Sequence, residues 1–212
     1  MRIAPVGLII STDDLDALVD LVVEASQVTH HTGIAIAGAA AVAAAVSGGI
    51  AGASVGEATT LGIRAAEIGQ QRGQWVAGAA VARRIACAVG LVDATDHDRS
   101  IPDVVELIGT SLATQESVPA AFAVLALHLR DPWQACLTAA SLGGDSDTIA
   151  AMTGAIAGAC HGMDAWPLHA VQTVRETNEW SLRSSPRSCW HCTPVHDHPV
   201  GQPPISVHTL RA

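Results

Sequence analysis

The segment from Gly33 to Ser54 carries no charged side chain and is long enough to cross a lipid bilayer. A chain with such a segment must either place it in a membrane or bury it in a protein core. Its residues are mainly Ala and Gly rather than Leu and Phe, so its transfer into lipid would release little free energy. His30, His31 and Glu57 also flank it closely. We therefore predict a buried core helix and no membrane association.

Helical patterning extends along most of the chain. Apolar residues recur at helical spacing, prolines stand where helices could begin, and no alternating strand pattern of useful length is present. We expect an all-α fold, an orthogonal multi-helix bundle. The predicted helices span residues 12–29, 33–46, 56–71, 76–91, 102–112, 119–129, 132–141, 149–160 and 167–183.

The composition predicts how such a bundle would pack. Apolar residues make up 49% of the chain, yet there is one Phe and no Tyr, so the core must rely on close helix packing rather than on aromatic bulk. Gly154, Gly158 and Gly162 recur at four-residue spacing and would leave a smooth helix face. We predict that this face lies at the centre of the bundle.

The composition changes after residue 183. Residues 184–212 hold five of the chain's ten prolines together with Cys189, His191 and Cys192. A Cys-x-x-Cys pair followed by histidines suggests zinc, but the spacing fits no small zinc module and no apolar core accompanies it. We predict a helical domain over residues 1–183 and a divergent, disordered tail over residues 184–212.

The charge of the chain, its N-terminus and its cysteines indicate which partners and which cellular location to expect. There is no lysine and the formal net charge is −9, which argues against nucleic acid or an anionic membrane as a non-specific partner. The N-terminus lacks the charged start, apolar run and cleavage pattern of a signal peptide. The cysteine spacing indicates no disulfide framework. We expect a cytoplasmic protein.

Residues 143–148, which read GGDSDT, indicate chemistry most clearly. The two glycines let the backbone bend and approach a ligand closely. The carboxylates and the threonine hydroxyl that follow are hard oxygen donors, which suit Mg²⁺ or Mn²⁺ rather than zinc. In the alternative interpretation, one aspartate only caps the following helix. The predicted metal ligands are Asp145, Asp147 and Thr148, and the predicted substrate contacts are Gly143 and Gly144.

The stretch GGDSDTIAAMTGAIAGACHG, residues 143–162, resembles the C-terminal metal motif of the ADP-ribosylglycohydrolase family, which includes the bacterial dinitrogenase-reductase-activating glycohydrolases. Residues 1–8, 28–47, 110–125 and 166–182 resemble other family segments in family order, so the resemblance covers about residues 1–182. It implies the all-α fold of that family and a binuclear Mg²⁺ or Mn²⁺ site. It also implies hydrolysis of the glycosidic bond between ADP-ribose and a protein side chain. The implied partners are ADP-ribosylated proteins or small molecules that contain ADP-ribose.

The resemblance also suggests residues that contact the substrate. Thr29-His30 resembles a family segment beside the ADP-ribose, so His30 is a candidate donor to a phosphate or a ribose. The alternative is a core histidine bonded to a backbone carbonyl. Glu116 and Ser117 fall in a predicted loop and are candidates for lining the substrate, against an ordinary capping role for Ser117.

One half of the family's metal site is not found where the resemblance would put it. Residues 1–5 resemble a segment that lies well inside family members, and the region before that segment supplies a glycine-rich motif and a Thr-Asp-Asp triplet. Thr12-Asp13-Asp14 has the same letters but follows the segment, so we interpret it as a helix N-cap with first-turn acids. Three hypotheses remain: a metal-dependent hydrolase, a truncated and inactive remnant that binds ADP-ribose or metal weakly, and a purely structural helical protein. The sequence assigns no catalytic residue.

Overall fold

The computed structural model describes residues 2–178, and over these residues all regular secondary structure is helical. An isolated β-bridge pairs Thr32 with Gln74. The predicted all-α class is confirmed. The α-helices are α1 (Ala4–Ile9), α2 (Leu15–Ser26), α3 (Gly33–Ile50), α4 (Val55–Gly69), α5 (Val81–Leu91), α6 (His97–Asp103), α7 (Thr114–Leu127), α8 (Pro132–Ser141), α9 (Ser146–His161) and α10 (Leu168–Asn178), with a π-helix η1 (Val104–Ile108) and a 3-10 helix η2 (Met163–Ala165).

The internal contacts divide the chain into two units, Met1–Val174 and Arg175–Ala212. Of the second unit only the last turn of α10 is described, so the account below concerns the first. The predicted domain boundary at residue 183 and the predicted tail, with its Cys-x-x-Cys pair, lie outside the described residues.

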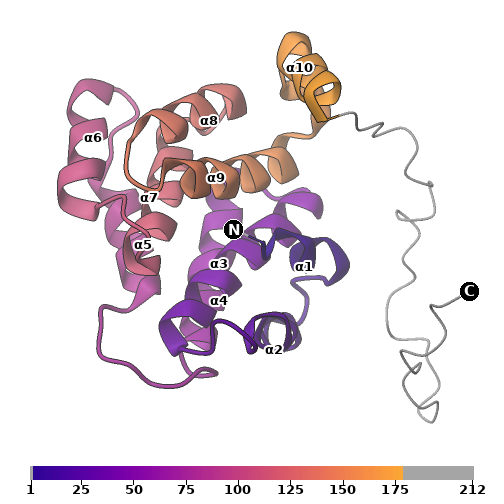
Figure 1. The fold of residues 1–212 in the computed structure, drawn as a ribbon, viewed down its shortest axis with the longest axis vertical. Helices are drawn as coiled ribbons and strands as arrows, with labels where there is room; N and C mark the ends of the chain where they lie inside the picture. Colours follow the sequence, from indigo (N-terminus) through magenta and orange to yellow (C-terminus); the bar gives the residue numbers. More distant parts are fainter. Residues whose placement is uncertain (1, 179–212) are drawn as a thin grey trace, which may run out of the picture. The chain divides into compact units, whose positions relative to one another are not determined.

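Helix α3 forms the centre of the core (Figure 1). Fifteen of its 18 residues are buried, and α1, α2, α4, α7 and α9 all pack against it. It is long and apolar enough to cross a membrane, but 83% of it is buried inside the protein. The predicted core helix is therefore confirmed, and this part of the segment has its apolar partners within the chain.

Glycines allow neighbouring backbones to touch α3. A Cβ atom added to Gly49 would lie 2.8 Å from Sγ and 2.9 Å from the backbone nitrogen of Cys160 on α9. A Cβ atom added to Gly7 on α1 would lie 2.4 Å from the carbonyl oxygen of Ala43. Both helices consequently pack on α3 at backbone distance, as expected for helix faces made of small residues.

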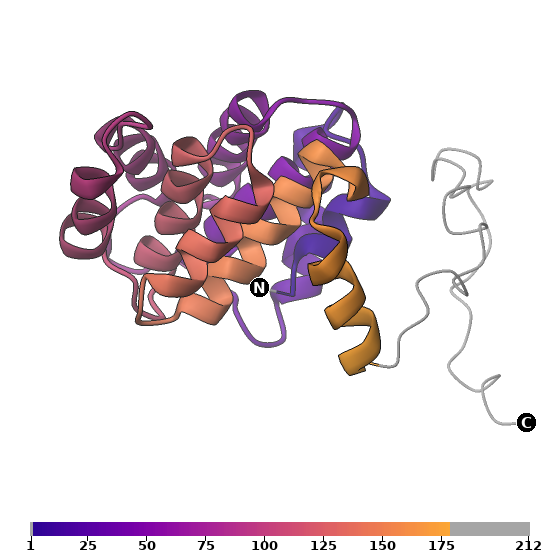
Figure 2. The same cartoon turned by 90° about the horizontal axis from the view of Figure 1, so that it is seen from above.

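The predicted glycine face of α9 is less important than the sequence suggests. A Cβ atom at Gly154 would lie 3.2 Å from Sγ of Cys136 on α8, and one at Gly158 would reach Trp166 at an ordinary 3.6 Å. Gly162 has a φ of 73° and ends the helix instead of extending its face. Among the helical glycines of the described residues, the closest contacts belong to α1 and α3, where a Cβ atom on Gly7 or Gly38 would lie 2.4 Å or 2.3 Å from a neighbouring atom. Helix α9 itself packs mainly along α8 (Figure 2).

The sequence also misplaces two helix starts. Pro102 and Pro119 were expected to open helices, but they lie inside α6 and α7. A proline within a helix leaves the carbonyl four residues earlier without its N–H partner. For Pro119 that carbonyl belongs to Gln115, and it accepts a hydrogen bond from Nε of Arg84 instead. This replacement partner offsets the loss and allows α7 to begin at Thr114.

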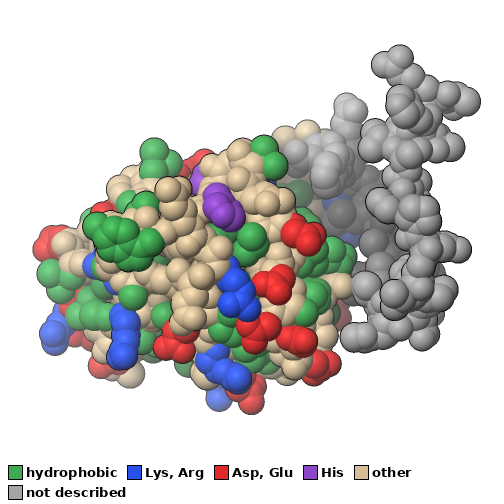
Figure 3. All heavy atoms as spheres, turned by 90° about the horizontal axis from the view of Figure 1, so that it is seen from below, with side chains coloured by type: hydrophobic (Ala, Val, Ile, Leu, Met, Phe, Trp, Pro, Cys, Tyr) green, Lys and Arg blue, Asp and Glu red, His purple; other side chains and the backbone are tan. Residues whose placement is uncertain are grey.

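Charged side chains are interspersed on the surface. Figure 3 shows one face on which acidic and basic side chains lie beside one another. Arg72 binds Asp16 at 2.5 Å and Asp20 at 3.0 Å, which ties the segment after α4 to α2. Because all three side chains are partly exposed, solvent screens both ion pairs and each contributes little to stability.

We expect Gly49→Ala to destabilise the protein by about 1–3 kcal/mol, because the added methyl group would overpack the contact between α3 and α9. Gly90→Ala is the matched control, since a Cβ atom there meets no atom within 4 Å. It should leave stability unchanged or raise it by up to about 1 kcal/mol. Urea unfolding of both variants measures the difference, and equal effects would contradict the close contact.

A second prediction concerns His128, a buried residue whose Nε2 lies 2.9 Å from Oγ1 of Thr138 and whose ring packs edge-on against His97. Burial, and then the neighbouring His97, lower the pKa of His128, and Asp131 opposes this only in part. The unfolded chain therefore binds this proton more readily than the folded protein. The stability that neutral His128 contributes should be present above pH 6.5, its ordinary pKa, and be lost progressively as the pH falls below that value.

The measurement is the free energy of unfolding of wild type and His128→Gln between pH 5 and 8. The difference between the two should shrink as the pH falls through this range. A difference that is constant with pH would show that His128 titrates alike in the folded and unfolded states.

Candidate functional site

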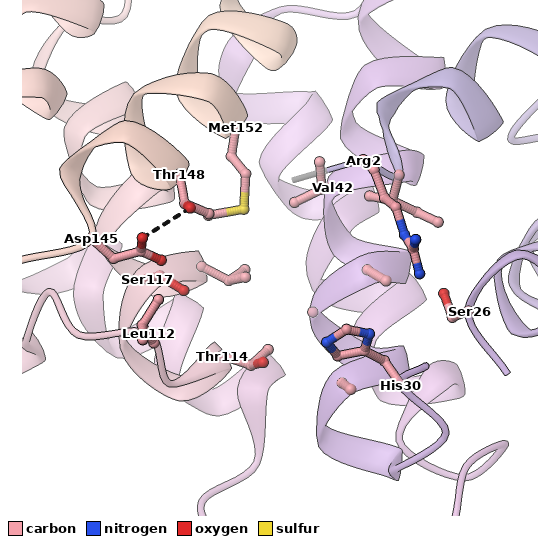
Figure 4. Close-up of a pocket in the computed structure, with 15 residues that line it drawn as sticks. Arg2, Ser26, His30, Val42, Leu112, Thr114, Ser117, Asp145, Thr148 and Met152 are labelled. Carbon is pink, nitrogen blue, oxygen red and sulfur yellow. Dashed lines mark hydrogen bonds between the residues drawn. The ribbon is translucent and has the colours of Figure 1, made fainter. Parts of the chain in front are cut away.

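A cavity of about 230 Å³ lies between α3 and the N-terminal turns of α7 and α9 (Figure 4). Its floor is apolar and its two sides carry polar groups. The apolar lining residues are Ile3, Ala35, Gly38, Ala39, Val42, Leu112, Val118 and Met152, and the polar ones are Arg2, Ser26, His30, Thr114, Ser117, Asp145 and Thr148.

Asp145 stands at the N-cap position of α9, but its carboxylate caps no backbone N–H. It accepts a hydrogen bond from the hydroxyl of Thr148 instead, at 3.0 Å. The simple capping interpretation of this aspartate is therefore wrong. The carboxylate and the hydroxyl form a pair of oxygen donors at the cavity wall, next to the positive end of the α9 dipole.

The two glycines before Asp145 have distinct roles. Both adopt left-handed backbone conformations, with φ of 80° at Gly143 and 65° at Gly144. A Cβ atom on Gly144 would lie 2.2 Å from the carbonyl oxygen of Thr110, whereas one on Gly143 would meet nothing within 4 Å. The same Thr110 carbonyl accepts the backbone N–H of Asp145 at 2.7 Å. Neither glycine lines the cavity, so direct substrate contact by Gly143 and Gly144 stays a prediction.

The opposite wall of the cavity carries cationic and hydrogen-donating groups. Nη2 of Arg2 donates to Oγ1 of Thr29, and the same hydroxyl lies 2.8 Å from Nδ1 of His30. If the hydroxyl donates to Nδ1, the imidazole proton lies on Nε2 and is free for a ligand. His30 is exposed at the cavity, so its alternative interpretation as a core histidine is wrong. Figure 4 shows its ring directed towards the space between the two walls.

Glu116 and Ser117 differ in position. Ser117 is buried, lines the cavity and donates its hydroxyl to the carbonyl of Ala113 at 3.2 Å. Glu116 does not line the cavity. Its carboxylate accepts the backbone N–H of Ser111 at 3.0 Å, and hydrogen bonds from Ser111 lower the pKa of Glu116. Its observed role is to shape the loop before α7, and substrate contact by Glu116 stays a prediction.

The Thr12-Asp13-Asp14 triplet does not belong to the cavity. Asp14 caps α2 by accepting the backbone N–H of Ala17 at 3.0 Å, and Asp13 accepts the hydroxyl of Ser11 at 2.8 Å. These residues do lead into a helix, as interpreted, but α2 begins at Leu15 with Asp14 as its N-cap, so Asp13 and Asp14 precede the first turn instead of lying in it.

The oxygen donors of the cavity wall fit one side of a hard divalent cation. Asp145 and Thr148 already face the same space, and Mg²⁺ and Mn²⁺ prefer carboxylate and hydroxyl oxygens. Asp147 follows in the first turn of α9 but is exposed outside the cavity lining. Within residues 2–178 no three His, Cys, Asp or Glu side chains gather as a ready metal cluster. The described residues thus offer part of a coordination sphere.

Sequence reasoning missed Arg2 and Thr114 as residues of the cavity. Arg2 is far from Asp145 in the sequence, and no spacing rule connects the two positions. The fold brings them together because α1 and α9 both pack on α3. The one local signal is that each lies within a segment that resembles the family, Arg2 in residues 1–8 and Thr114 in residues 110–125.

The chain is similar to several known proteins. A model of the ADP-ribosylglycohydrolase family matches residues 1–190. The uncharacterized protein YegU of Escherichia coli (strain K12) is 36% identical over 166 residues, which cover 78% of this chain and 50% of YegU. The ADP-ribosylhydrolase ARH3 of Danio rerio is 35% identical over 115 residues, 48% of this chain and 30% of that protein. The ADP-ribosylhydrolase ARH3 of Homo sapiens is 43% identical over 75 residues, which cover 31% of this chain and 21% of that protein. The chain therefore spans half the length of YegU and less of ARH3.

The contact between Gly144 and Thr110 leads to a prediction. Gly143→Ala should cost about 1–2 kcal/mol, since it only forces an alanine into a left-handed conformation. Gly144→Ala should cost about 1–3 kcal/mol more, because its methyl group would displace the Thr110 carbonyl. Urea unfolding tests the order of the two variants. A greater loss for Gly143→Ala would overturn the proposed arrangement of this turn.

Proposed function

The chain belongs to the ADP-ribosylglycohydrolase family, and from that premise we propose that its cavity binds the ADP-ribose unit of a modified substrate. The substrate is an ADP-ribosylated protein side chain or a small molecule that contains ADP-ribose. In the reaction we propose, water is added across the glycosidic bond, so that ADP-ribose leaves and the side chain is restored.

The opposed chemistry of the two cavity walls is the observation that carries this proposal. Arg2 and His30 on one side suit the negative charge of a diphosphate. Asp145 and Thr148 on the other side suit hydroxyl groups or a divalent cation. ADP-ribose combines a diphosphate with ribose hydroxyls. A purely structural helical protein would have no need for an aspartate that leaves its own helix uncapped.

Asp145, Thr148 and, from the adjacent position, Asp147 would hold Mg²⁺ or Mn²⁺. A bound divalent cation would polarise ribose oxygens and favour deprotonation of a water molecule. The residues of the chain have the remaining tasks. Arg2 and His30 orient the diphosphate, and the apolar floor around Val42 and Met152 keeps bulk water away from it.

The cavity favours binding over rapid turnover. Glycoside hydrolysis generally uses two carboxylates in separate roles. Among the described residues that line the cavity, Asp145 is the single carboxylate, and as a metal ligand it could not also act as a free general base. This observation supports a second candidate function, in which the chain by itself binds ADP-ribose without hydrolysing it efficiently.

Binding of ADP-ribose to the 212-residue chain tests the proposal. Titration calorimetry with and without Mn²⁺ should show binding that Mn²⁺ strengthens. Asp145→Asn should remove this Mn²⁺ dependence, and Asp147→Asn should reduce it. Arg2→Ala should weaken binding by about tenfold or more, since a charge-assisted hydrogen bond to phosphate is lost. Arg64→Ala, an exposed arginine on α4 outside the cavity, is the matched control.

Absence of ADP-ribose binding to the folded wild-type chain would overturn the proposed function. If ADP-ribose does bind, an assay for its release from an ADP-ribosylated arginine peptide distinguishes the hydrolase from the binding-only function. We expect slow release by the chain alone. Rapid Mn²⁺-dependent release that Asp145→Asn abolishes would show that a second catalytic group operates and would exclude the binding-only function.

A further inference from the structure

The loop of residues 109–113, between η1 and α7, determines where Asp145 lies. The carbonyl of Thr110 in this loop accepts the backbone N–H of Asp145, and the backbone of Gly144 rests directly on Thr110. Leu112 in the same loop, and Thr114 just after it, line the cavity. A shift of this loop would therefore move the Asp145 carboxylate and one wall of the cavity together.

The two ends of the loop carry carbonyl groups that lack helical partners. The π-helix η1 stops at Ile108 because Gly109 turns away with a φ of 88°. Past the other end, Pro119 has no N–H to offer the carbonyl of Gln115. Unpaired carbonyls at partly buried positions are unfavourable and need a donor.

Arg84 on α5 satisfies both carbonyls with one side chain. Its Nη2 donates to Ile108 at 2.5 Å, and its Nε donates to Gln115. A planar guanidinium can hold two acceptors at once in a fixed geometry, whereas the single ammonium group of a lysine cannot reproduce that fork. Arg84 thus bridges the start of the loop and the first turn of α7 that follows it.

Glu116 holds the interior of the same loop. Its carboxylate accepts the backbone N–H of Ser111, and Gly109 approaches so closely that an added Cβ atom would lie 2.5 Å from Oε2 of Glu116. The positive charge of Arg84 also acts on this carboxylate. The neighbouring Arg83, in contrast, is exposed and makes no hydrogen bond or ion pair with the described residues.

We propose that Arg84 is a positioning residue of the candidate site. It holds the loop of residues 109–113 so that Thr110 fixes Asp145 in the cavity wall, although Arg84 itself is not among the residues that line the cavity. The inference deepens the proposed function and rests on it for its consequence in ligand binding. Its structural part, the placement of Asp145, does not depend on the identity of the ligand.

The test uses amide hydrogen exchange of the 212-residue chain, followed by NMR at the Asp145 N–H that donates to Thr110. Arg84→Met should lower protection of this amide by about tenfold or more, because two charge-assisted hydrogen bonds are lost. Arg83→Met removes the same charge from the adjacent position and should leave protection unchanged. Arg84→Lys keeps the charge without the fork, so it should fold and still lose protection at Asp145.

Wild-type protection of the Asp145 amide in Arg84→Met or Arg84→Lys would overturn the inference. If Arg84→Met does not fold, Arg84→Lys alone decides. Affinity for ADP-ribose with Mn²⁺ is the second readout, and it should fall about tenfold in Arg84→Met but not in Arg83→Met. If wild type binds no ADP-ribose, the proposed function fails, while the exchange result still decides the role of Arg84.

Discussion

The structure depends on the close approach of helices to α3. This helix has few large side chains, so its neighbours pack on it at backbone distance, as Gly49 does with Cys160 and Gly7 with Ala43. Little apolar area is buried per residue by alanine and glycine, and dispersion contacts at short range must compensate. The geometry of the core is consequently intolerant of added atoms. Close packing holds α1, α7 and α9 in defined positions on α3. As a result, residues of α9 and of the N-terminal segment line one cavity.

The two walls of the cavity differ in chemistry because different segments of the chain form them. The N-terminal end of α9 brings Asp145 and Thr148 to one wall, while the segment after α2 brings His30 and its partner Thr29 to the other. The oxygen wall is held from behind by a chain of contacts from Arg84 through the 109–113 loop to Asp145. Residues outside the cavity lining, such as Arg84 and Thr110, therefore help to determine where Asp145 lies.

Part of the fold and of the candidate site could be predicted from the sequence, because it depends on residues that lie close together in the chain. The uncharged Ala/Gly-rich segment predicted the core helix, and the GGDSDT stretch predicted a tight turn with oxygen donors before a helix. Pro119 was misread as a helix start, because its effect depends on a distant partner, Arg84, that satisfies the carbonyl of Gln115. Arg2 was missed for a related reason. Its relation to Asp145 exists only through the packing of two helices on a third, which no local pattern records.

The N-terminus of α9 lacks the side-chain cap that an aspartate at this position usually provides. An aspartate at an N-cap ordinarily accepts a backbone N–H and stabilises its helix by about 1 kcal/mol. Asp145 forgoes that bond, and its carboxylate pairs with Thr148 at the cavity wall instead. Asp14, Asp96 and Asp131, at the starts of α2, α6 and α8, make the ordinary capping bonds, so among the described α-helices that have an aspartate at the N-cap the departure is confined to α9. Local rules are usually broken where another demand outweighs them. Under the proposed function, that demand at Asp145 is the binding of a ligand, and the two glycines before it, with positive φ, shape the turn that presents its carboxylate.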